Sequence, residues 1–88
     1  MKVEQIEYQC RKIIYYLVGR RGLQDFKITH KEFESDIDWI QIELLFDESW
    51  LVMETLLEGL DWLRPGLRQR VPRSVKLYLI INGKWEEL

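Results

Sequence analysis

The sequence predicts a two-layer α+β domain in which helices cover one face of a mostly antiparallel sheet. Apolar residues recur at helical spacing in two segments, alternate with polar residues in three others, and an Asn-Gly pair marks a late turn. The expected order is helix, strand, strand, helix, short helix and strand, and the Asn-Gly pair adds the option of a C-terminal hairpin. Residues 1–88 are expected to form one domain.

Residues 2–21 have the pattern of an amphipathic helix. Arg20 and Arg21 suit the negative end of the helix dipole, and Gly22 suits a left-handed cap. The apolar side chains fall three or four positions apart and form one stripe: Val3, Ile6, Cys10, Ile13 and Leu17, widened by Ile14 and Val18.

Two strands are expected to follow as a hairpin. Residues 26–33 alternate in polarity, with Phe26, Ile28 and His30 on one side, and residues 34–36 have the composition of a turn. The alternation in residues 37–46 is typical of a half-buried antiparallel strand. One side of that strand has Ile40, Ile42, Leu44 and Phe46, and the other has Trp39, Gln41, Glu43 and Leu45.

A second helix is expected after residues 47–49, whose Asp and Ser side chains are suited to its N-cap. Pro65-Gly66 predicts that this helix ends or kinks sharply, and residues 67–71 then form a short helical turn closed by Pro72. The apolar positions of the second helix are Trp50, Met53, Leu57 and Leu60, broadened by Val52, Leu56 and Leu63.

Residues 74–82 predict a strand in the middle of the sheet, because both of its faces include apolar residues. Asn82-Gly83 is the strongest short turn signal in the chain. Residues 84–86 are therefore expected to fold back as a short edge strand.

The formal net charge is −2, but the charges are unevenly distributed. Residues 1–22 sum to +3, residues 23–63 to −9 and residues 64–88 to +4. The single cysteine excludes an internal disulfide, and no apolar run reaches the ~18 residues of a membrane span. The N-terminal residues lack a signal-peptide pattern. We therefore expect a cytoplasmic protein that makes no membrane contact.

Residue types that carry catalysis or bind metals are sparse. Cys10 and His30 would form a dyad only by meeting across the helix–sheet interface, and Cys10 is expected to pack in the apolar stripe instead. The carboxylates at the expected hairpin tip have the oxygen chemistry of a Ca²⁺ or Mg²⁺ site but lack the EF-hand spacing: Glu32, Glu34, Asp36 and Asp38. The sequence therefore predicts a protein without a metal ion or cofactor and without enzyme activity. The competing hypothesis of an enzyme would assign catalysis to these hairpin carboxylates.

Recognition is expected instead from arginine and tryptophan side chains. Four arginines lie between Arg64 and Arg73, and a guanidinium grips carboxylate or phosphate through two hydrogen bonds. Four tryptophans exceed what one small core holds, so at least one of Trp39, Trp50, Trp62 and Trp85 should be exposed at an interface. The predicted partner-binding residues are Trp62, Arg64, Arg68, Arg70, Arg73 and Trp85.

These features predict a small protein-binding or regulatory module that acts through an aromatic and basic surface. The arginines would bind an acidic surface on an unidentified protein partner, or the acidic segment 23–63 of a second copy of the chain. A homodimer is the expected form of self-association.

The order of elements also resembles the type II KH fold of ribosome-binding factor A, in which a helix kinked at a small residue precedes the last strand. Here residues 60–68 supply a kink before residues 75–81, and Gly59 stands near where that family's kink falls. The resemblance implies RNA binding, for which the segment from Arg64 to Arg73 would serve. Phosphate contacts dominate such binding, so the strongly acidic middle of the chain makes RNA the alternative to a protein partner.

Overall fold

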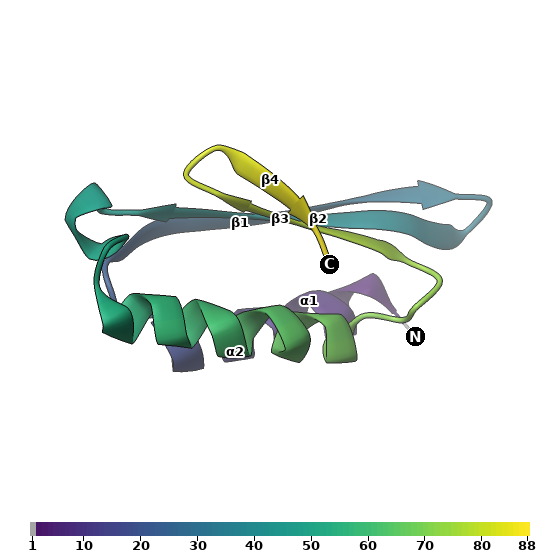
Figure 1. Ribbon diagram of the computed structural model, residues 1–88. Coiled ribbons are helices and arrows are strands. Elements are labelled where there is room, and N and C mark those ends of the chain that lie inside the picture. The colour runs from purple at the N-terminus through teal and green to yellow at the C-terminus, as the bar shows by residue number, and fades with distance from the viewer. Residues whose placement is uncertain (1) are drawn as a thin grey trace.

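The computed structural model describes residues 2–88 and confirms the expected α+β class (Figure 1). The four strands form one sheet in the order β1-β2-β3-β4, and both helices lie against the same face. The elements are α1 (Val3–Val18), β1 (Leu23–Phe33), β2 (Asp36–Phe46), the 3-10 turn η1 (Glu48–Trp50), α2 (Glu54–Arg70), β3 (Lys76–Ile81) and β4 (Lys84–Glu87).

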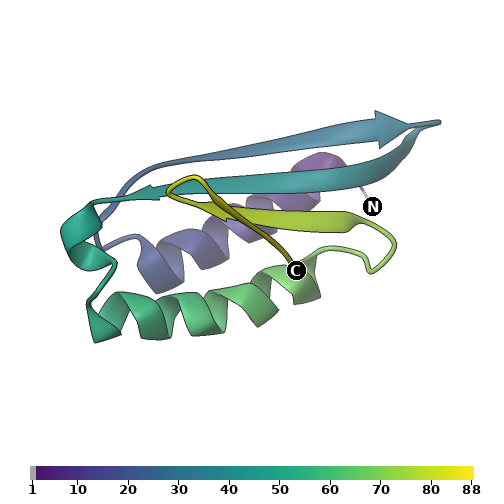
Figure 2. The same ribbon diagram turned by 45° about the horizontal axis from the view of Figure 1, so that its top comes forward.

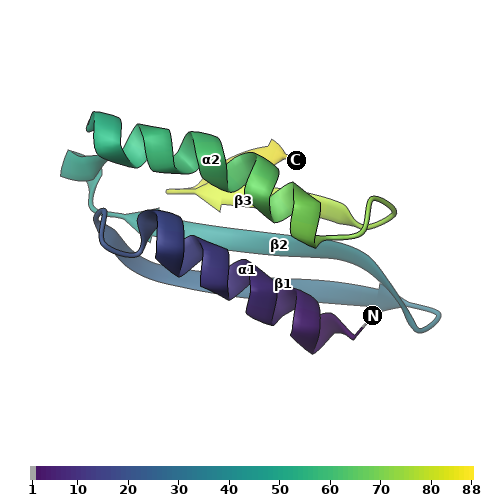
Figure 3. The ribbon, with the colours of Figure 1, turned by 90° about the horizontal axis from the view of Figure 1, so that it is seen from below.

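The outer strand pairs are antiparallel hairpins, whereas the middle pair, β2 and β3, is parallel. A parallel pair needs a crossover connection, and α2 supplies it between the end of β2 and the start of β3. Figure 3 shows α1 and α2 side by side over the sheet. The sheet is therefore mostly antiparallel, as predicted, with β3 in its interior.

The β1–β2 hairpin turns at Glu34 and Ser35, whose φ angles of 51° and 70° are both positive. Two consecutive positive φ values are typical of the tight turns that match the twist of paired strands. β1 begins at Leu23 rather than at residue 26, so the hairpin is longer than the alternation predicted. Figure 2 shows that the tip extends well beyond β3.

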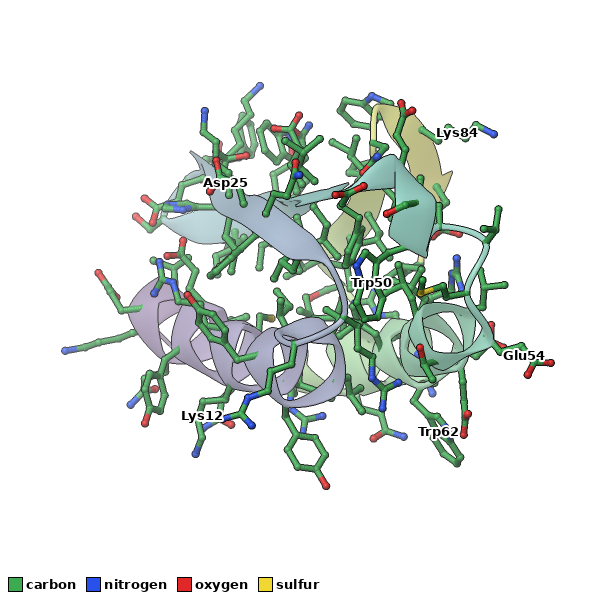
Figure 4. All side chains as sticks on the ribbon, turned by 90° about the vertical axis from the view of Figure 1, so that its left-hand side faces the viewer. Lys12, Asp25, Trp50, Glu54, Trp62 and Lys84 are labelled. Atoms are coloured by element: carbon green, nitrogen blue, oxygen red, sulfur yellow. The ribbon has the colours of Figure 1, made fainter. Side chains whose placement is uncertain are left out.

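The second helix begins later than the sequence predicted. The Asp47 side chain accepts hydrogen bonds from Ser49 N at 3.0 Å and Ser49 Oγ at 2.8 Å, which is the predicted capping chemistry. That cap closes only the 3-10 turn η1, and α2 starts at Glu54. Trp50 consequently lies on the turn instead of the helix, half-buried against the core between the two layers (Figure 4).

A helix end at Pro65-Gly66, one of the two predicted outcomes, is wrong, because α2 continues through both residues to Arg70. A proline inside a helix removes the hydrogen bond to the carbonyl four residues earlier, which here belongs to Asp61. Asp61 and Pro65 both lie on the exposed side of α2, where water solvates a freed carbonyl. The separate short helix predicted for residues 67–71 is therefore absent from the described residues 2–88, and residues 67–70 form the last turn of α2 instead.

The last hairpin agrees with the prediction, and Asn82 also forms hydrogen bonds with β2. Its amide side chain accepts a hydrogen bond from Phe46 N at 2.8 Å and donates one to Phe46 O at 2.9 Å. Asn82 N also donates to Leu44 O at 3.0 Å. The Asn82 side chain thus extends the parallel β2–β3 ladder by one step beyond the end of β3.

The core lies between the helices and the sheet. It combines the predicted stripe of α1, the predicted inward face of β2, and apolar residues of α2 and β3. Its largest fully buried members are Phe46, Ile6, Ile14, Ile40, Ile42, Leu44, Leu56, Leu63, Leu67, Leu77, Leu79 and Val18.

Candidate functional site: a groove between the two helices

Arg64 forms ion pairs with two carboxylates of its own chain. Its Nε donates to both carboxylate oxygens of Glu86, at 2.9 and 3.1 Å, and its Nη1 lies 3.3 Å from Asp61 Oδ1. These contacts tie α2 to the edge strand β4. Arg64 therefore supports the fold along this side of the sheet.

Arg68 holds the connection between α2 and β3. Its Nη2 donates to the carbonyls of Val71, Pro72 and Val75 at 3.2, 2.7 and 3.0 Å. Its Nη1 lies 3.4 Å from the carbonyl of Leu88, beside the end of β4. Within residues 2–88 the buried Nε has no hydrogen-bond partner. A guanidinium directed at backbone carbonyls is not presented to a partner.

Arg70 and Arg73 complete the predicted arginine group. Arg70 Nη1 donates to Gly66 O at 2.9 Å, one turn earlier on α2, while Arg73 is exposed in the connection to β3. The four arginines thus do not form one open basic patch, because two of them, Arg64 and Arg68, serve the fold.

Trp62 and Trp85 are exposed, as the count of tryptophans predicted, with 65% and 60% of their surface accessible. They lie on opposite sides of the domain. Trp62 extends from α2 away from the sheet (Figure 4), whereas Trp85 pairs with Ile80 on the face that the helices leave open. The six predicted residues therefore do not form one site, and the structure assigns its two exposed tryptophans to two surfaces.

The surface around Trp62 is a groove between α1 and α2, with a volume of about 930 Å³. The helices approach closely because α2 presents Gly59 and Gly66 to α1. A Cβ at Gly59 would lie 2.8 Å from Leu17 O, and one at Gly66 would overlap Ile13 Cδ1. This close approach makes Ile13 and Gly66 adjoining parts of the groove wall.

The groove has aromatic walls. Tyr16 of α1 is 86% exposed and faces the groove that Trp62 also lines, and Pro65 adds an apolar ring on α2. Large exposed aromatic side chains that line one hollow are typical of a binding surface.

The charges along the groove have one sign. Among residues 2–88, its ionisable lining groups apart from tyrosine hydroxyls are Lys12 and Arg70, and no carboxylate lines it. Gln9 and Gln69 contribute amides. A second depression of about 410 Å³ shares three lining residues with the groove and adds Arg20 and Arg21. The combined surface is apolar with a cationic rim, which suits an apolar ligand that carries acidic groups.

The sequence identified Trp62 and Arg70 but missed the rest of this groove. Ile13 and Leu17 were assigned to the core stripe, and Pro65-Gly66 to a helix end. The available signal was Tyr16, which lies off the apolar stripe of its helix just as Trp62 lies off the core positions of α2. Only the pairing of the two helices brings these residues together.

Cys10 and His30 do not form a catalytic dyad. Cys10 is completely buried, and His30 Nδ1 lies 2.9 Å from Glu7 Oε1. Burial raises the pKa of the Cys10 thiol from 9.0 to about 11, with Arg70 opposing the shift and Glu7 adding to it. Across residues 2–88 no three His, Cys, Asp or Glu side chains are grouped in a way that would bind a metal ion.

The raised pKa of Cys10 predicts a loss of stability at alkaline pH. Between pH 9 and pH 11 the unfolded thiol ionises while the folded thiol remains protonated, so ionisation favours the unfolded state. Relative to C10A, the wild-type free energy of unfolding should fall by about 2 kcal/mol from pH 9 to pH 11. Urea unfolding of both proteins across this range measures the difference. Tyrosine and lysine titrations are common to both, so parallel pH profiles would contradict the prediction.

No protein-family model matches the chain, and comparison with curated proteins and with solved structures also finds no match. Neither α1 nor α2 has the length and apolar content that a bilayer-spanning helix requires, and the same holds for all of residues 2–88.

Proposed function

We propose that the protein is a non-enzymatic protein-binding module whose groove between α1 and α2 docks an apolar, acidic segment of a partner. The groove carries this proposal, because exposed Tyr16 and Trp62 lie in a hollow whose charged lining groups, Lys12 and Arg70, are both cationic. An amphipathic helix with acidic flanks fits such a groove, since its apolar stripe covers the aromatic walls and its carboxylates meet the cations.

The geometry favours protein over RNA as the partner. RNA binding through the segment from Arg64 to Arg73 needs free guanidinium groups, but Arg64 is paired with Glu86 and Arg68 with four carbonyls. With Arg20 and Arg21 of the adjoining depression, the groove surface supplies four cations, which is fewer than the roughly 6–10 phosphate contacts typical of nucleic-acid binding.

A designed peptide helix tests the proposal directly. Its leucine stripe is flanked by glutamates, and a second peptide carries lysines in place of the glutamates. We expect the acidic peptide to bind at least about tenfold more tightly than the basic one, by fluorescence anisotropy. W62S should raise its Kd by about tenfold or more, because the central aromatic contact is lost.

W85S is the matched control, since Trp85 is about as exposed as Trp62 but lies on the opposite side. It should change the peptide Kd by less than about twofold. Equal binding of the two peptides would contradict the acidic preference, and equal effects of the two tryptophan variants would contradict the assignment to the groove. A polyuridine oligonucleotide that displaces the acidic peptide would favour RNA instead.

A further inference from the structure

The sheet face that the helices leave uncovered has an apolar centre. Ile80 is only 4% exposed although it lies outside the core beneath the helices. Trp85 is its cross-strand neighbour, and the Tyr78 and Trp85 rings meet edge to face with centroids 5.9 Å apart. Trp39 is half-buried on the same side of β2. Solvent-facing sides of sheets are normally polar, so this cluster of aromatic side chains is unusual for an unpartnered face.

The shape of this face suits a copy of itself. Figure 1 shows the β3–β4 hairpin rising from the sheet on the side away from the helices, while β1 and β2 run flat. The face thus has a raised half and a flat half. A two-fold rotation about an axis along the strands places the raised half of one copy against the flat half of the other.

The charges of the open face are balanced, so two such faces do not repel each other as a whole. Three lysines and three carboxylates surround the aromatic centre: Lys27, Lys31, Lys76, Asp25, Glu43 and Glu87. Each half is neutral, because the flat half presents Lys27, Lys31, Asp25 and Glu43 and the raised half presents Lys76 and Glu87. The strand register puts Glu87 level with Thr29, which lies between Lys27 and Lys31 on β1. The two-fold rotation brings β4 of one copy over β1 of the other, so Glu87 approaches these two lysines of its partner.

We infer that the open face is the interface of a homodimer, in which Trp85 and Glu87 of each copy contact β1 of the other. This surface is distinct from the groove of the proposed function, and the inference does not depend on that function. The groove cannot play the same part, because two surfaces with only cations in their linings repel each other. The three carboxylates also disfavour a nucleic acid on the open face, since phosphates would meet them directly.

Charge reversal with rescue tests this interface. Sedimentation velocity of the full chain at several concentrations should show a dimer. K31E places a carboxylate opposite Glu87 and should raise the dimer Kd by at least about tenfold. E87K should do the same by opposing Lys31. The double variant K31E/E87K restores opposite charges and should return the Kd to within about threefold of wild type.

W85S and W62S separate this interface from the groove. W85S should weaken the dimer and W62S should leave it unchanged, with circular dichroism confirming that each variant is folded. A wild-type monomer at all concentrations would overturn the inference, as would dissociation by W62S or failure of the double variant to rescue. A monomer that binds a polyuridine oligonucleotide through Trp85 would replace the inference with RNA recognition.

Discussion

G22A should lower the free energy of unfolding by about 3 kcal/mol or more. Gly22 connects α1 to β1 with a φ of +82°, in the left-handed region that costs other residues about 1–2 kcal/mol. A Cβ at this position would also overlap Cγ and Cδ1 of Trp50, which packs against the core. Forcing atoms into such a contact adds typically about 1–3 kcal/mol. Chemical denaturation monitored by circular dichroism measures the loss.

G83A is the matched control. Gly83 has nearly the same backbone angle, with φ +84°, but a Cβ there would meet no atom within 4 Å. Its loss should be about 1–2 kcal/mol, the backbone cost alone. The difference between the two variants isolates the packing of Trp50 against the turn, and equal losses would show that this packing adds nothing.

Arg68→Met should lower the free energy of unfolding by about 3 kcal/mol. The substitution keeps most of the side-chain volume but removes the donors that bind the carbonyls of Val71, Pro72 and Val75. Hydrogen bonds to a charged group contribute about 1.5–3 kcal/mol each, and a half-buried carbonyl left unpaired adds a desolvation cost. Urea unfolding monitored by tryptophan fluorescence measures the effect.

Arg73→Met provides the comparison, because Arg73 lies exposed in the connection that Arg68 holds. Its effect should stay within about 0.5 kcal/mol. Arg68→Lys should fall between wild type and Arg68→Met, because one ammonium cannot reach all of these carbonyls in the geometry of a planar guanidinium. Similar losses from Arg68→Met and Arg73→Met would contradict the structural role of Arg68.

Most of the fold was predictable because its signals are local. The alternation in residues 37–46 identified which side of β2 is buried, and Asn82-Gly83 identified the last hairpin. The continuation of α2 through Pro65 was not predictable, since the cost of a proline depends on whether the carbonyl one turn earlier is exposed. That exposure is set by which face of α2 packs on α1, a tertiary property that propensity does not contain.

The candidate site was predictable only in part, for a related reason. The excess of tryptophan correctly indicated exposed aromatic side chains, and Trp62 and Trp85 are among them. Which arginines remain free was not predictable, because their partners include residues far away in the sequence. Glu86 of β4 pairs with Arg64, and the carbonyl of Leu88 lies beside Arg68. Clustering in sequence therefore indicated a basic segment without showing which of its charges remain free.

The placement of both helices on one face of the sheet has a consequence for avidity. The groove is lined by Trp62, which extends from α2 away from the sheet (Figure 4), so it is not covered when two copies pair through their sheets. Such a dimer would carry two grooves that face away from each other on opposite sides. Consider a partner with two acidic segments joined by a linker long enough to span both grooves. Its second segment would then bind at high effective concentration, whereas a shorter linker would give no increase in affinity.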